Sequence, residues 1–69
     1  MNSNTIPSHL KLIDVNELSI ILSVSKRTIW RMVSSGKLVE PVRIGGSIRW
    51  KLIEIEAWIN EGCPEVERT

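Results

Sequence analysis

The sequence has few of the residues that build disulfides, metal sites and membrane spans. It contains one cysteine, Cys63, and one histidine, His9. A lone thiol closes no internal disulfide, and no cluster of Cys or Asp surrounds His9 to build a zinc site. No apolar run approaches the roughly 20 residues that cross a bilayer, and residues 1–11 lack the apolar core of a signal peptide. We expect a cytosolic protein without metal, cofactor or membrane partner.

The polar residues also lack the arrangements on which enzymes depend. There is no paired-carboxylate set, no nucleophile–base set and no phosphate-cradling glycine motif. A chain of 69 residues buries only about 60% of its unfolded surface, which leaves little room for a deep substrate cavity. With 42% hydrophobic and 25% charged residues, the composition is typical of one small globular domain. We therefore expect a protein that is not an enzyme.

The net charge of +1 conceals an uneven distribution along the chain. Residues 26–51 carry seven Lys and Arg against Glu40 alone. Residues 52–69 carry five Glu against Arg68 alone. Such a basic block is compatible with an ordinary solvated surface or with a polyanionic partner such as nucleic acid.

A first helix is predicted to begin at Asp14, because Asp14 and Glu17 form a D-x-x-E capping box. Leu12 and Ile13 precede this cap, where an apolar residue can staple the start of the helix. Ile20 would be exposed, where it offers a small contact site for a partner. The inner face of the helix is expected to hold Val15, Leu18 and Leu22, with Ile21 at its edge.

A second helix is predicted over residues 26–35, with Ser25 as its N-cap and Gly36 in the left-handed position after its end. Its two sides differ in chemistry. The apolar arc of its helical wheel holds Ile29, Met32 and Val33, and the opposite arc holds Arg27, Trp30, Arg31 and Ser34. We expect a core face and a separate cationic face.

A hairpin and a third helix follow. Gly45-Gly46 supplies two residues for the positive φ values of a two-residue turn, which predicts strands over residues 42–44 and 47–50. Two strands alone are marginal, so this hairpin must pack against the helices. A last helix is predicted over residues 53–61, with Ile53 at its cap position. Its inward residues are expected to be Ile55, Trp58 and Ile59, and Trp50 is expected to join them in the core.

The predicted architecture is mainly α with a small β-hairpin: a winged helix-turn-helix of three helices plus a two-stranded wing. It would occupy residues 11–62, between a flexible N-terminal arm at 1–10 and a frayed C-terminal tail at 63–69. A helix of this kind fits the major groove of DNA, and its N-terminal amides favour phosphate. The candidate DNA-binding residues are Ser25, Lys26, Arg27, Thr28, Trp30 and Arg31 on the helix, with Arg43 and Arg49 on the wing.

Alternatives stay open at several of these positions. Trp30 either packs under the wing or contacts the sugar-phosphate backbone. One of Arg43 and Arg49 could face the helices or pair with Glu40 instead of contacting DNA.

The chain carries a series of short motifs in a specific order and spacing. They are Glu17-Leu18, Val24-Ser25-Lys26-Arg27-Thr28-Ile29-Trp30-Arg31, Ser35-Gly36-Lys37-Leu38, Pro41-Val42-Arg43-Ile44-Gly45-Gly46, Arg49-Trp50 and Ile55-Glu56-Ala57-Trp58-Ile59. With these motifs, the chain closely resembles the AlpA-type, excisionase-like helix-turn-helix regulators of the MerR-like winged-helix group. Two positions depart from that pattern. Ser23 replaces the usual turn glycine, at a cost of roughly 1 kcal/mol if the position needs positive φ, and Ile53 replaces the usual polar cap.

The resemblance implies a small bacterial protein, associated with a phage or mobile element, that binds double-stranded DNA at the nucleoid. Such proteins activate transcription, often of an integrase, or direct excision, so RNA polymerase or integrase is an implied partner. The small contact area of one module favours cooperative self-association on repeated sites. The alternative is a protein-interaction adaptor or anti-regulator that keeps the fold without binding DNA, using Ile20 and the acidic last helix.

Overall fold

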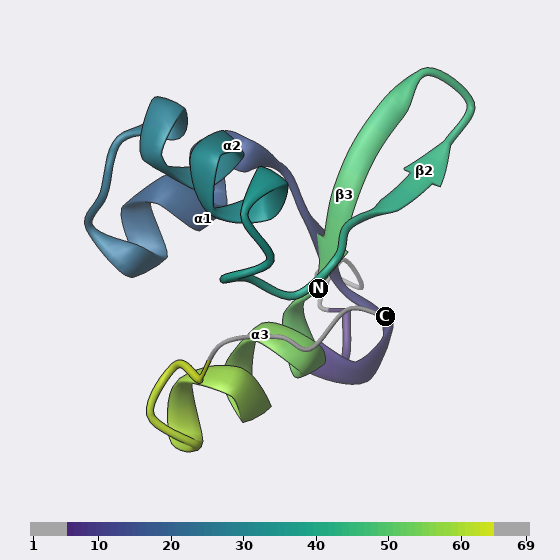
Figure 1. The fold of residues 1–69 in the computed structure, drawn as a ribbon. Coiled ribbons are helices and arrows are strands. Elements are labelled where there is room, and N and C mark those ends of the chain that lie inside the picture. Colours follow the sequence, from purple (N-terminus) through teal and green to yellow (C-terminus); the bar gives the residue numbers. More distant parts are fainter. Residues whose placement is uncertain (1–5, 65–69) are drawn as a thin grey trace.

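The computed structural model describes residues 6–64, so the outer parts of the predicted arm and tail, residues 1–5 and 65–69, lie outside the described residues. Within the described part, three residues of the predicted arm form a short 3-10 helix. The elements in chain order are η1 (Ser8–Leu10), β1 (Leu12–Ile13), α1 (Val15–Leu22), α2 (Lys26–Ser34), β2 (Val42–Ile44), β3 (Ser47–Lys51) and α3 (Leu52–Asn60). Figure 1 shows α1 and α2 crossing beside the base of β3, with the β2–β3 hairpin projecting away from them.

The caps of the first two helices form as predicted. The Glu17 amide donates to Asp14 Oδ1 at 2.8 Å, and the Asp14 amide donates to Glu17 Oε1 at 3.2 Å, which completes the capping box of α1. At the start of α2 the Thr28 amide donates to Ser25 Oγ at 3.1 Å. These local hydrogen bonds fix where each helix begins.

The turn between α1 and α2 depends on a serine in a left-handed conformation. Ser23 has φ 57° and ψ 40°, and its amide donates to the Ile20 carbonyl at 3.3 Å. The Val24 amide donates to the Ser19 carbonyl at 3.1 Å, so the chain reverses within two residues. A side chain with a Cβ is strained in this region, so Ser23 carries the cost that the sequence indicated.

We expect Ser23→Gly to stabilise the domain by about 0.5–1 kcal/mol, since glycine adopts positive φ without strain. Urea unfolding followed by circular dichroism measures the change in midpoint. Ser35→Gly is the comparison at a position without strain, because Ser35 follows α2 with φ −95°; it also loses the hydrogen bond from Ser35 Oγ to the Met32 carbonyl, so it should not stabilise the domain. A midpoint for Ser23→Gly no higher than that of the native protein would contradict the strain at Ser23.

The hairpin belongs to a three-stranded antiparallel sheet with strand order β1-β3-β2, and not to an isolated two-stranded wing. Leu12 pairs with Lys51, and Ile13 pairs with Trp50. The sequence places these two residues before the cap of the first helix and does not predict this strand. A strand of two residues is too short to show an alternating pattern, so its pairing is visible only in the folded chain.

Only one glycine of the hairpin turn has positive φ, which corrects the expectation for Gly45-Gly46. Gly45 has φ 60°, and Gly46 lies outside the left-handed region. Positive φ at the first central residue alone is the pattern of a type II′ turn. No atom lies within 4 Å of the place where a Cβ would stand on either glycine, so the tip of the hairpin is open to solvent.

The third helix differs from the prediction at its cap and on one face. It begins at Leu52, with Lys51 as a cap residue that makes no side-chain hydrogen bond to the helix, so Ile53 is not the cap. Ile59 is 38% exposed and does not face inward as predicted. The inner side of α3 consists of the buried Ile55 and Trp58, with Leu52 half-buried against the core. The Trp58 indole N–H donates to the Pro64 carbonyl at 2.8 Å.

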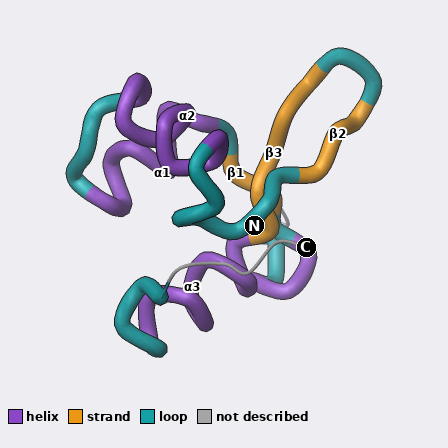
Figure 2. Tube along the Cα trace, viewed as in Figure 1, coloured by secondary structure: helices purple, strands orange, loops and turns teal. Residues whose placement is uncertain are grey.

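The core joins every helix to the base of the sheet. Its buried side chains are Ile13, Leu18, Ile29, Leu38, Trp50, Ile55 and Trp58. Val15, Leu22, Met32 and Val33 are half-buried against it, so the predicted inner faces of α1 and α2 are confirmed. Figure 2 shows how the helices and strands themselves are arranged, with α3 at the end of the molecule opposite the hairpin tip.

Candidate nucleic-acid interface

Helix α2 carries its cations on the side that it turns away from the core. Ile29 is fully buried beneath the helix, whereas Lys26, Arg27 and Arg31 are exposed. Ser25 and Thr28 lie at the N-terminal end, where their hydroxyl oxygens are 3.0 Å apart. The folded helix therefore has the core face and the cationic face that the sequence predicts.

The cations of this surface have no acidic partner in the part of the chain that the structure describes. Over residues 6–64 no carboxylate forms an ion pair with Lys26, Arg27, Arg31 or Arg43, whereas Lys51 Nζ lies 3.9 Å from Glu54 Oε2. Unpaired exposed cations at short spacing make a local positive field, which attracts polyanions. The surface is therefore electrostatically suited to phosphate.

The two arginines of the hairpin lie on opposite faces of it. Arg43 is paired across the strands with Ile48, and Arg49 is paired with Val42. Because side chains alternate along a strand, Arg43 shares its face with Ile48 and Trp50, which is the side of the sheet that packs on the core. Arg49 points from the other face, is half-buried, and donates from Nη1 to the Ile48 carbonyl at 2.9 Å. The structure does not bring the two guanidinium groups together.

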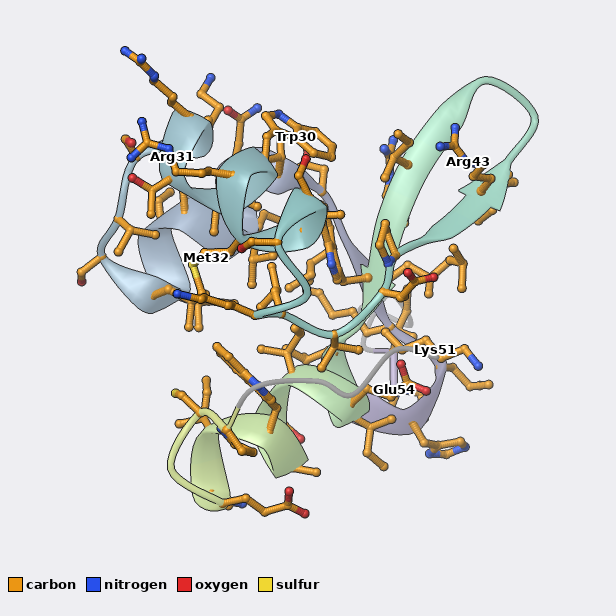
Figure 3. All side chains as sticks on the ribbon, in the orientation of Figure 1. Trp30, Arg31, Met32, Arg43, Lys51 and Glu54 are labelled. Atoms are coloured by element: carbon orange, nitrogen blue, oxygen red, sulfur yellow. The ribbon has the colours of Figure 1, made fainter. Side chains whose placement is uncertain are left out.

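Trp30 lies between the cationic face of α2 and the base of the hairpin. Its ring centroid is 5.6 Å from that of Trp50, with the rings tilted by 45°, and 38% of the residue stays exposed. In Figure 3 Trp30 projects from the side of α2 that faces the hairpin, and Arg31 projects from the side away from it. Trp30 thus packs beneath the wing while keeping an edge on the surface.

The Trp30–Trp50 contact was not foreseen from the sequence. Trp50 was expected in the core, where it is indeed fully buried, but its ring also supports the candidate interface. The sequence signal is the aromatic character of both residues, which are 20 positions apart and on different elements. Only the tertiary structure shows that Trp30 is the residue that contacts Trp50.

The acidic residues of the last helix lie apart from these cations. Glu54, Glu56 and Glu61 are exposed on or directly after α3, at the opposite end of the molecule from the hairpin tip (Figure 1). The charge segregation of the sequence therefore becomes a spatial separation. Among the described residues, no group of three or more His, Cys, Asp or Glu is arranged to hold a metal ion. In the same part of the chain, no helix is long and apolar enough to span a membrane.

Comparison with known proteins gives one match. No curated protein and no solved structure matches the chain significantly. A family model described as a helix-turn-helix domain matches residues 12–63, which includes α1, α2, the hairpin and α3. AlpA-type and excisionase-like domains fall in that family, so the resemblance is confirmed at this level, while the wider MerR-like grouping stays a prediction. Two helices joined by a tight turn, a cationic second helix and this match lead to one conclusion: the chain belongs to the helix-turn-helix domain family.

Proposed function

We propose that this protein binds double-stranded DNA in a sequence-specific manner, with α2 in the major groove and the hairpin on the adjacent backbone. One observation carries the proposal: the second helix of a helix-turn-helix domain exposes cations that have no acidic partner within residues 6–64. A helix of this diameter fits the major groove, and its first turn presents amides that favour phosphate.

The exposed residues of α2 are suited to two kinds of contact with DNA, to base edges and to phosphates. Arg27 and Arg31 are one helical turn apart on the exposed side of α2, so both can reach guanine edges, each through two hydrogen bonds. Lys26 at the helix start is suited to phosphate, as are Ser25 and Thr28 through their hydroxyls. Base contacts would supply specificity, and phosphate contacts would supply orientation and most of the affinity.

The hairpin can contact the DNA backbone although its two arginines lie on opposite faces. A two-stranded ribbon is narrow. When it lies along a groove of DNA, each of its two faces therefore turns towards one of the two phosphate backbones that border the groove. On this arrangement Arg43 and Arg49 contact different strands of the duplex. The exposed edge of Trp30 would then lie against a sugar between the helix and the hairpin.

We expect binding to weaken steeply with salt. If between three and five of the cations at 26, 27, 31, 43 and 49 neutralise phosphates, the slope of log affinity against log salt is between about −2.7 and −4.5. Arg43→Ala should reduce this slope by about 1, because it removes one phosphate contact. Lys11→Ala is the matched control, since Lys11 is exposed next to β1, and its slope should equal that of the native protein. Titration of a labelled duplex at several salt concentrations measures the slopes.

The cellular role that we propose is regulation for a phage or mobile element, as a transcriptional regulator or as an excisionase that sets the direction of recombination. Both roles use the same DNA contact, in the cytoplasm of a bacterium at the nucleoid, with RNA polymerase or integrase as the protein partner. An integrase gene next to this one would favour the mobile-element role, whichever of the two activities the protein has. Selection of bound sequences from random duplexes tests the specificity directly, and recovery of no shared sequence would contradict it.

We also propose that copies bind cooperatively to repeated sites, because a single small module has a limited contact area with DNA. Footprinting across a selected site should show adjacent protected repeats that fill together. One isolated site occupied by a monomer with full affinity would contradict this arrangement.

A protein-interaction role is the second candidate, and Ile20 supports it. Ile20 is 76% exposed and the neighbouring Ile21 is 44% exposed, which places two aliphatic side chains on the outer side of α1. An adaptor that used them would tolerate charge changes on α2 and would lose its partner on Ile20→Ser. The DNA-binding function predicts the reverse for both substitutions.

A further inference from the structure

The hairpin is anchored at its base and free at its tip. At the base, Trp50 is fully buried and pairs with Ile13, and its indole N–H donates to the Val39 carbonyl at 3.0 Å. At the tip, a Cβ placed on Gly45 or Gly46 would meet no atom within 4 Å outside the adjacent residues. The position of the tip relative to α2 is therefore decided at the base.

Because the hairpin is fixed only at its base, a small rotation there produces a larger displacement of the tip. The tip lies four to five residues beyond Trp50, which is roughly 15 Å at about 3.3 Å per residue. A rotation of about 10° at the base then moves the tip by about 2–3 Å. Arg43 pairs with Ile48, two residues from Trp50, so its backbone lies about 7 Å from the base and the same rotation moves it by about 1 Å. Hydrogen bonds to phosphate oxygens have donor–acceptor distances of about 2.7–3.2 Å, so a shift of about 1 Å is enough to break one. A wing that contacts DNA at the same time as α2 needs a fixed angle at its base.

Trp30 is placed to fix that angle. Strand β3 makes its main backbone contacts with β1, β2 and α3. The large Trp30 side chain reaches from α2 to Trp50, with a centroid separation of 5.6 Å and a tilt of 45°. The contact joins the only two elements whose relative placement matters for simultaneous contact with groove and backbone.

We propose that Trp30 is a positioning residue that sets the angle between α2 and the hairpin by packing on Trp50, so that Arg43 reaches the phosphate backbone when α2 is in the groove. The proposal rests on the DNA-binding function for its consequence at Arg43. The angle between α2 and the hairpin is a property of the protein without DNA, so this part of the proposal is tested on the free protein.

The first test measures the angle in the free protein. A nitroxide is attached at Ser47→Cys beside the hairpin tip, in a Cys63→Ser background, and its relaxation effect on the amides of α2 is recorded by NMR. We expect strong, localised broadening with Trp30, the same pattern with Trp30→Phe, and weaker broadening spread over more amides with Trp30→Ala. Unchanged broadening in Trp30→Ala would overturn the positioning role. If Trp30→Ala does not fold, Trp30→Leu is measured in its place, with the same expectations.

The second test measures the coupling of Trp30 to Arg43 on a selected duplex. Arg43→Ala is expected to weaken binding about tenfold in the native background and in Trp30→Phe. In Trp30→Ala the same substitution should cost less than twofold, because the misplaced hairpin has already lost the contact. A purely structural role for Trp30 would leave the tenfold effect of Arg43→Ala unchanged in all three backgrounds, which would overturn the proposal.

The two tests separate this inference from the proposed function. If the native protein binds no duplex, the DNA-binding function fails, and the nitroxide experiment still decides whether Trp30 holds the hairpin. If the native protein binds DNA and the Arg43→Ala effect does not depend on Trp30, the function stands and the positioning role is wrong.

Discussion

Reversing both arginines of α2, Arg27→Glu together with Arg31→Glu, is expected to weaken duplex binding by about 100-fold or more and to leave the fold intact. Each arginine contact with a base or phosphate is worth about 1–3 kcal/mol, and a carboxylate in its place adds repulsion from the backbone. Both side chains are exposed and without an acidic partner in residues 6–64, so their replacement breaks no ion pair of the described chain. Fluorescence anisotropy of a labelled duplex at constant salt measures the loss.

The controls for this experiment separate position from net charge. Lys11→Glu changes the net charge as much as Arg31→Glu does, and it lies next to β1, away from α2. It should weaken binding only slightly, and all variants should unfold at the same urea midpoint. Equal losses for Lys11→Glu and Arg31→Glu would mean that overall charge, and not the face of α2, determines binding. Full affinity in the double variant would favour the adaptor role.

Trp50→Ala is expected to abolish cooperative folding or to come close to it. Removing a buried tryptophan costs about 3–5 kcal/mol, and a domain of 69 residues has a total stability of roughly 3–10 kcal/mol. The substitution also leaves the Val39 carbonyl without its indole donor and removes the support of the Trp30 ring. Thermal unfolding followed by circular dichroism should show a broad, early transition or none.

Trp30→Ala is the control for this effect. Trp30 is 38% exposed and Trp50 is fully buried, so the loss at position 30 should be clearly smaller and the transition should stay cooperative. Two tryptophans in contact are thus expected to differ in what they support, one the fold and the other the interface. A Trp50→Ala variant that unfolds cooperatively within about 1 kcal/mol of the native protein would contradict the assignment of Trp50 to the centre of the core.

The two helices of the motif could be predicted because their signals are local. The Asp14–Glu17 capping box and the Ser25 cap each span four residues, and both form the hydrogen bonds that the sequence indicates. The apolar periodicity of α2 also identified its exposed side, because a helix of nine residues completes more than two turns. A helix with strong caps and a clear period needs little tertiary information.

The errors occur where distant parts of the chain decide the local structure. Strand β1 exists because Leu12 and Ile13 pair with residues almost 40 positions away, and two residues carry no period of their own. The start of α3 was misplaced because β3 continues directly into it at Lys51, without a polar cap to mark the boundary. Ile59 looked internal from its spacing with Ile55, but α3 packs on the core through Ile55, Trp58 and the half-buried Leu52, and Ile59 lies outside that face.

The divergence of the hairpin arginines was within reach of the sequence. A two-residue turn at Gly45-Gly46 pairs Ile44 with Ser47, which in turn pairs Arg43 with Ile48. Side-chain alternation then places Arg49 on the other face. The sequence could not show in which direction each face of the hairpin points, because that direction depends on how Trp50 packs on α2 and the core.

The most direct test of the DNA-binding surface is NMR mapping of the protein with a selected duplex. We expect the largest amide shifts in residues 25–31 of α2 and residues 43–49 of the hairpin, with small shifts on the outer side of α1 at Ile20 and along α3. Shifts confined to Ile20, Ile21 and α3, with α2 unperturbed, would contradict the account.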